Sequence, residues 1–197
     1  PSARIVDHYA RRGAPGHDLT TRVLPVSYAR AEVEIRDLLA GSGFEAALLL
    51  GVAGHESHLR LEQWGCRRVG GGPDSDGQVT ALEGLSAGAP ERYPATVALE
   101  PLLSELHEAG LRARLSEDAG SYVCNHTYYA ALHTIAARGL STRCLFLHVP
   151  PGPETLGDPG EGPAMPLELQ IAAVGRILAW LAREGPRRSW QSGLGAG

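Results

Sequence analysis

Three side chains in this sequence could together open an amide bond: Cys124, His148 and Glu62. Cys124 lies near the start of a predicted helix, where partial positive charge and free N–H groups favour a thiolate over a thiol. The same N–H groups could stabilise an oxyanion that develops during the reaction. A small apolar core cysteine is the alternative interpretation, and position alone leaves the two interpretations equally open.

His148 comes at the end of a strand-like segment that Pro150 and Pro151 stop. A histidine at this place can reach the N-terminus of a neighbouring helix and act as a base toward a thiol. Taken alone, such a residue is more often a surface histidine at a strand end. The presence of Cys124 upstream favours the catalytic interpretation.

Glu62 belongs to an alternating segment in which Leu59 and Leu61 face one way and the polar side chains face the other. A carboxylate on this polar face could orient an imidazole and stabilise its charged form, as the third member of a catalytic triad does. Two alternatives stay open, a solvated strand residue and a salt bridge with the neighbouring Arg60.

The elements that must position these residues alternate between strands and helices along the chain. This order predicts an α/β sandwich around a mostly parallel, twisted sheet, in which sites gather beyond the carboxyl ends of the strands. The sequence predicts helices at residues 1–12, 28–39, 100–110, 122–139 and 166–184, and strands at residues 21–26, 45–54, 58–64, 95–99, 111–116 and 142–150.

Composition limits the class of protein. The chain has 197 residues, a formal net charge of −4 and 43% hydrophobic residues, which suits one globular domain with a proper core. We assign residues 1–185 to a single α/β domain and residues 186–197 to a flexible tail. No nucleic-acid or membrane partner is expected from this charge and these short apolar runs. The lack of a visible leader and three cysteines without CxxC spacing indicate a reducing cytoplasm.

Two further motifs carry weaker signals. The segment "HESH" places His55 and His58 three residues apart instead of four, in a stretch that is not predicted to be helical, so we expect no metal site. The segment "GGGP" lacks the Lys-Ser/Thr of a phosphate loop and is interpreted as a turn. A nucleoside phosphorylase-like enzyme, which shares the broad fold class, is therefore disfavoured.

Four segments of the chain resemble the pyroglutamyl peptidase I (pyrrolidone-carboxylate peptidase) family of cysteine peptidases. "SEDAGSYVCNHTYY" is similar to the active-site segment of the family, and "LGVAGHESHLRLEQ" and "FLHVPPGPE" are similar to the segments that carry its catalytic glutamate and histidine. "TTRVLPVSYARAEVEI" resembles its strand-to-helix passage. The resemblance implies that Cys124 is the nucleophile, His148 the general base and acid, and Glu62 the residue that orients His148.

The resemblance also implies a three-layer α/β/α sandwich and the removal of N-terminal pyroglutamyl (5-oxoproline) residues from peptides through a thioester acyl-enzyme. Members are commonly cytoplasmic homotetramers without a metal or organic cofactor, and their substrates are peptides that begin with pyroglutamate. Hydrogen bonds to the lactam could reject proline, because a buried polar group left unpaired costs about 1–3 kcal/mol.

The chain also departs from the family pattern. It begins at "PS", as though after the family's first strand and its loop G-F-x-P-F-G, and we expect the domain to lack that strand and loop. Gln63 follows Glu62 where arginine is usual, and "GGPDSDG" takes the place of the family's R-I-P-D-N loop. The alternative function is therefore a catalytically impaired member that binds a ligand or partner on the same scaffold.

Overall fold

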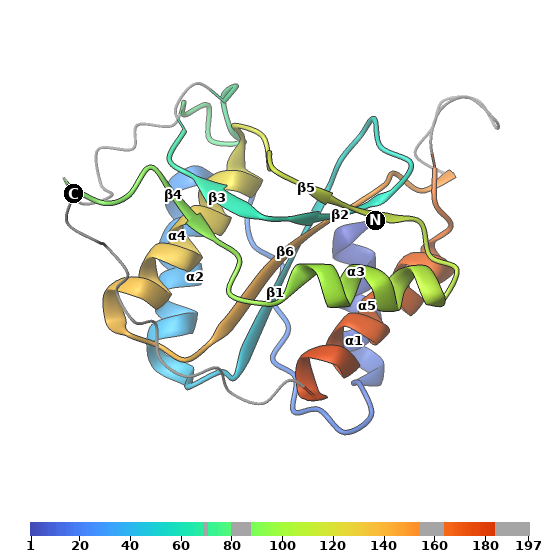
Figure 1. Cartoon of the computed structure of the whole chain (residues 1–197). Coiled ribbons are helices and arrows are strands. Elements are labelled where there is room, and N and C mark those ends of the chain that lie inside the picture. Colours follow the sequence, from blue (N-terminus) through green and yellow to red (C-terminus); the bar gives the residue numbers. More distant parts are fainter. Residues whose placement is uncertain (69–70, 80–87, 154–163, 184–197) are drawn as a thin grey trace, which may run out of the picture.

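The computed structural model describes residues 1–68, 71–79, 88–153 and 164–183 (Figure 1). Its main sheet has four strands in the order β1-β6-β2-β5. The pairs β1–β6 and β2–β5 are parallel and the central pair β2–β6 is antiparallel, so the prediction of a mostly parallel sheet is confirmed. The strands are β1 (Ala46–Val52), β2 (Leu59–Glu62), β5 (Ala113–Ser116) and β6 (Arg143–Val149).

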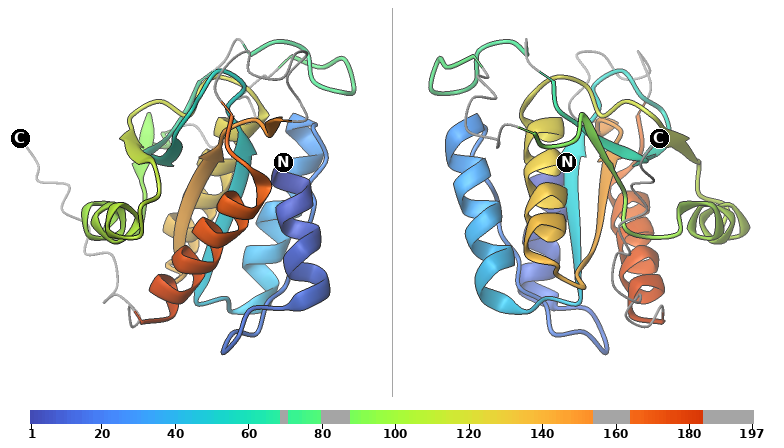
Figure 2. Two further views of the ribbon diagram at one scale, coloured as in Figure 1. Left: turned by 90° about the vertical axis from the view of Figure 1, so that its right-hand side faces the viewer. Right: turned by 60° about the vertical axis from the view of Figure 1, so that its left-hand side comes forward.

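Helices cover both faces of this sheet, as the two views in Figure 2 show. One core cluster joins α1, α3 and α5 to one face, and a second joins α2 and α4 to the other. The predicted three-layer α/β/α sandwich is thus confirmed. The helices are α1 (Ser2–Arg12), α2 (Tyr28–Ser42), α3 (Leu99–Glu108), α4 (Val123–Arg138) and α5 (Leu167–Arg183).

The local sequence explains the elements that matter for the site. Strand β6 is buried along its whole length, with an apolar run from Cys144 to Leu147 between Arg143 and His148. Helix α2 begins where the Ser27 hydroxyl accepts a hydrogen bond from the Arg30 backbone N–H. Helix α4 ends at Gly139, whose φ of 61° lies in the left-handed region that glycine adopts at helix ends.

Two predicted strands are wrong. Residues 21–26 form no strand, because Pro25 lacks an N–H donor and the flanking Val23 and Val26 are exposed. Residues 95–99 form none either, because Leu99 already begins α3 and Pro101 fits the first turn of that helix. The structure instead has a small antiparallel sheet that the sequence did not predict, made of β3 (Trp64–Cys66) and β4 (Arg92–Pro94).

Some expectations stay predictions. Residues 186–197, the predicted tail, lie outside the described part of the chain. The same is true of residues 69–70 and 80–87 in the segment 69–90, for which the sequence predicts loops and a small hairpin. Strand β1 lies at one edge of the main sheet, and the expectation of a missing first strand and loop is untested. Among the helices described, none is long and apolar enough to cross a bilayer.

Candidate active site

Strand register brings the polar side chains of β2 and β6 to one face of the sheet. Arg60 lies opposite His148, and Glu62 lies opposite Phe146. Leu59 and Leu61 point to the other face and are fully buried there, so the predicted alternation of β2 is confirmed. The polar face is the one that α4 covers.

Glu62 and His148 form a buried pair. Glu62 Oε1 lies 2.7 Å from His148 Nδ1, and the Glu62 side chain has no exposed surface. A carboxylate accepts hydrogen bonds only, so a neutral His148 carries its proton on Nδ1 and leaves Nε2 as an acceptor. That tautomer is the one a general base needs.

Cys124 and His148 meet above Gly51 of the neighbouring strand β1. A Cβ atom built on Gly51 would lie 2.9 Å from Cys124 Sγ and 2.9 Å from His148 Cδ2, so these two atoms are within twice that distance of each other. Cδ2 is the carbon bonded to Nε2. Only a residue without a side chain leaves room for the two groups at this place. The structure therefore brings the three predicted site residues together.

The electrostatics of Cys124 differ from the expectation. Burial raises the pKa of this thiol to about 11, and the negative charge of Glu62 acts in the same direction. The helix N-terminus was expected to favour the thiolate, but here desolvation outweighs its N–H groups. The raised pKa opposes loss of the thiol proton near pH 7, so a base has to remove it.

Several supporting residues were missed or left undecided by sequence reasoning. The Tyr128 hydroxyl donates to the Glu62 backbone carbonyl at 3.2 Å. Asn125, which follows the nucleophile, accepts from the Cys66 N–H at 2.9 Å and donates to the Cys66 carbonyl at 2.7 Å. The signal for Tyr128 was its position one helical turn after Cys124, on the same face of α4. These contacts join α4 to β2 and β3 near the thiol.

The remaining candidates lie apart from this cluster. Cys144 is fully buried, and burial raises its pKa to about 12, in keeping with the prediction of an inert core residue. Cys66 is half-buried, and its pKa is also raised by burial. His58 Nδ1 lies 2.8 Å from the Ser57 hydroxyl. Within the described ranges no group of three or more histidine, cysteine or acidic side chains could hold a metal ion, His55 and His58 included.

A buried carboxylate, an imidazole and a thiol gathered on an α/β/α sandwich are the constituents of a cysteine hydrolase. The family model described as pyroglutamyl peptidase matches residues 1–183. The chain therefore belongs to the pyroglutamyl peptidase family.

Individual relatives agree with this assignment. The pyrrolidone-carboxylate peptidase of Pyrococcus furiosus is 32% identical over 158 residues, which cover 78% of this chain and 76% of that protein. Pyrrolidone-carboxylate peptidase 1 of Ralstonia nicotianae is 30% identical, with 88% of this chain and 81% of that protein covered. The crystal structure of pyrrolidone carboxyl peptidase from Fervidobacterium islandicum superimposes with a TM-score of 0.82 at 31% identity, covering 91% of this chain and 89% of that chain.

Proposed function

We propose that this chain hydrolyses the bond after an N-terminal pyroglutamyl residue of a peptide, with Cys124 as nucleophile, His148 as general base and acid, and Glu62 orienting His148. One observation carries the proposal. Cys124 and His148 meet at the Gly51 position, and Glu62 lies 2.7 Å from His148, in a chain of the pyroglutamyl peptidase family.

Attack on the carbonyl begins the reaction. His148 Nε2 takes the proton from Cys124 Sγ while the sulfur bonds to the pyroglutamyl carbonyl carbon, and Glu62 stabilises the imidazolium that forms. Burial raises the pKa of Cys124 to about 11, so the thiol relies on His148 to take its proton. The first N–H groups of α4 are the available donors to the resulting oxyanion.

Two further steps complete the cycle. The C–N bond breaks, the amine leaves with the proton from His148, and pyroglutamate stays on Cys124 as a thioester. His148 then removes a proton from water, which attacks the thioester carbonyl. The sulfur leaves and regains its proton, and free pyroglutamate is released.

The test is hydrolysis of a pyroglutamyl-coumarin substrate by the full-length protein. Wild type is expected to turn over, Cys124→Ala to be inactive, and Cys66→Ala, which removes a cysteine outside the cluster, to keep its activity. Lack of turnover by wild type, or activity that survives Cys124→Ala, would contradict the proposal. A non-catalytic binding protein has no observation in its favour, since the relatives above are named as peptidases.

The family resemblance supports a proposal for the oligomeric state of the enzyme and for the compartment in which it acts. We propose a homotetramer that acts in the cytoplasm on peptides with an N-terminal pyroglutamate, without a metal or organic cofactor. Light scattering coupled to size-exclusion chromatography checks the assembly. A mass near that of one 20.8 kDa chain would contradict it.

A further inference from the structure

Glu62 needs a partner with a permanent positive charge. Its side chain is fully buried, and a carboxylate removed from water is costly unless it is paired. His148 contacts it at 2.7 Å, but a general base starts its cycle as a neutral imidazole and brings no charge at that stage. The triad alone therefore leaves the carboxylate without a counterion before each turnover.

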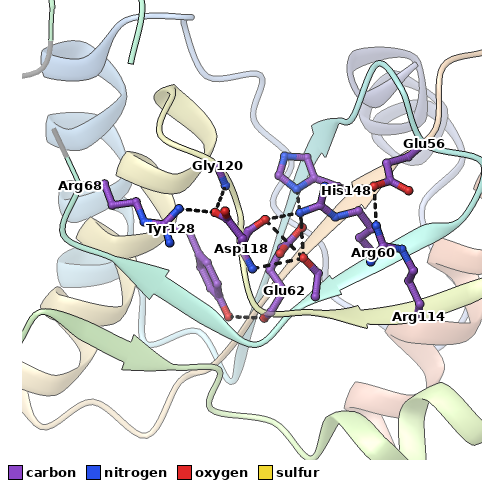
Figure 3. Close-up of polar contacts among 10 residues, drawn as sticks. Glu56, Arg60, Glu62, Arg68, Arg114, Asp118, Gly120, Tyr128 and His148 are labelled. Atoms are coloured by element: carbon purple, nitrogen blue, oxygen red, sulfur yellow. Dashed lines mark hydrogen bonds and ion pairs between the residues drawn. The ribbon is translucent and has the colours of Figure 1, made fainter. Parts of the chain in front are cut away.

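Arg60 supplies that charge. Its Nη2 lies 3.0 Å from Glu62 Oε1, the same oxygen that His148 Nδ1 contacts, and Figure 3 shows the three side chains converging. A guanidinium stays protonated at every pH at which the enzyme works. Glu62 Oε2 has no hydrogen-bond partner among the described residues, so both of its polar side-chain contacts fall on one oxygen.

Arg60 is itself fixed in place. Its Nη2 donates to the hydroxyl of Ser116, the last residue of β5, at 2.8 Å. It also donates to the backbone carbonyl of Asp118, two residues beyond the strand. Its Nη1 lies 3.4 Å from Glu56 Oε1, and the side chain is only 16% exposed. These contacts distinguish Arg60 from an exposed surface arginine, whose ion pairs contribute little.

We propose that Arg60 is a positioning residue of the reaction: it balances the buried charge of Glu62 and holds Oε1 against His148 Nδ1, so that Nε2 faces Cys124 as the base. This inference rests on the roles given to Glu62, His148 and Cys124 above. Arg60 contacts no reacting atom. It acts on the reaction through Glu62, and its loss impairs the chemical step and leaves substrate binding intact.

Arg114 offers a matched control. It lies opposite Arg60 on the neighbouring strand β5 and contacts the same Glu56 Oε1. Its side chain is 47% exposed, and its ion pair is with Glu56 and not with Glu62. Removing Arg114 therefore deletes an arginine of the same sheet that contacts the same Glu56 carboxylate. It leaves the contact between Arg60 and Glu62 in place.

The experiment compares kcat and KM for wild type, Arg60→Gln, Arg60→Lys and Arg114→Met on a pyroglutamyl-coumarin substrate, with thermal unfolding of each variant. Arg60→Gln is expected to lower kcat by about 10- to 100-fold with KM within about twofold, as loss of an orienting contact does. Arg60→Lys keeps the positive charge but not the planar guanidinium that reaches Glu62, Ser116 and Glu56 at once, so its kcat is expected to be about threefold higher than that of Arg60→Gln and still below wild type. Arg114→Met is expected to stay within about twofold of wild type.

The outcomes separate this inference from the proposed function. An active wild type and an inactive Cys124→Ala, together with an Arg60→Gln variant as active as Arg114→Met, would overturn the role of Arg60 alone. Equal kcat values for Arg60→Lys and Arg60→Gln would also overturn it. If Arg60→Gln does not fold, Arg60→Lys must still show a lower kcat with an unchanged KM, and a wild-type kcat in that variant refutes the inference. An inactive wild type would refute the proposed function itself.

Discussion

The two faces of strands β2 and β6 differ in almost every respect, although they are built from alternating residues of the same segments. One face presents leucines and a valine to α1, α3 and α5: Leu59, Leu61, Leu145, Leu147 and Val149. Its one charged side chain in these two strands, Arg143 at the start of β6, donates to the backbone carbonyl of Leu181 in α5. The other face presents Arg60, Glu62 and His148 to the start of α4. The twofold period of a strand thus places the chemistry directly behind the core that holds it.

The two faces therefore stabilise the fold by different means. The apolar face contributes through buried area, which tolerates changes of similar volume. The polar face depends on pairing, since Glu62 has no exposed surface and each of its side-chain contacts is charged or polar. A substitution should therefore affect folding on one face and chemistry on the other.

The largest effect is expected for Glu62→Gln on the polar face. An amide cannot fix the Nδ1–H tautomer of His148 or balance its positive charge, so kcat should fall by about 10³- to 10⁴-fold. Steady-state kinetics on a pyroglutamyl-coumarin substrate measure this, with circular dichroism to confirm folding. A folded variant with less than a tenfold loss would remove Glu62 from the mechanism.

Gly51→Ala is expected to disturb the same face from the neighbouring strand. Its new Cβ would lie 2.9 Å from Cys124 Sγ, His148 Cδ2 and Phe146 Cε1, so these side chains must move. Moving Cys124 and His148 out of their relative positions is expected to lower kcat by about 10²-fold. Gly54→Ala is the matched control, because a Cβ at Gly54 would meet nothing within 4 Å. Similar kinetics for the two variants would contradict the close approach of Cys124 and His148.

The alkylation of Cys124 by iodoacetamide should depend strongly on pH. Only the thiolate reacts, and burial raises the pKa of Cys124 to about 11, so the rate in the free enzyme should rise about tenfold per pH unit from pH 7 to pH 10. Peptide mapping by mass spectrometry distinguishes alkylation of Cys124 from alkylation of Cys66. A rate that levels off below pH 8 would mean that a thiolate already exists at rest.

The smallest effect on chemistry is expected from the apolar face. Leu61→Ala removes a fully buried side chain next to Glu62 in sequence, and should lower the free energy of unfolding by about 2–5 kcal/mol. Its kcat per folded molecule should stay within about twofold of wild type, because the side chain points away from His148. Urea unfolding and kinetics on the same sample test this. A large loss of kcat at full folding would show that the two faces are coupled.

Much of this arrangement was predictable from the sequence because it follows from local periodicity. The alternation around Leu59 and Leu61 predicted the polar face of β2, and the proline stop after His148 predicted the end of β6. Cys124 was correctly placed near the start of its helix. Whether these residues carry out the reaction stays a prediction.

Features that depend on long-range packing could not be predicted. The pairing of β3 with β4 joins short segments far apart in the chain, and neither segment has a strand pattern of its own. The raised pKa of Cys124 results from burial by the whole fold, which outweighs the local helix end. From the sequence, a salt bridge with Arg60 was only an alternative to a catalytic role of Glu62. In the structure Arg60 and His148 both contact Glu62 Oε1.

Detection of the acyl-enzyme tests the central claim most directly. Wild-type protein mixed with a pyroglutamyl peptide and quenched rapidly in acid should carry one pyroglutamyl group, and peptide mapping should place it on Cys124. The adduct should be absent from Cys124→Ala and should be cleaved by hydroxylamine, as a thioester is. Turnover by wild type without any adduct at Cys124, or an adduct at another residue, would contradict the account.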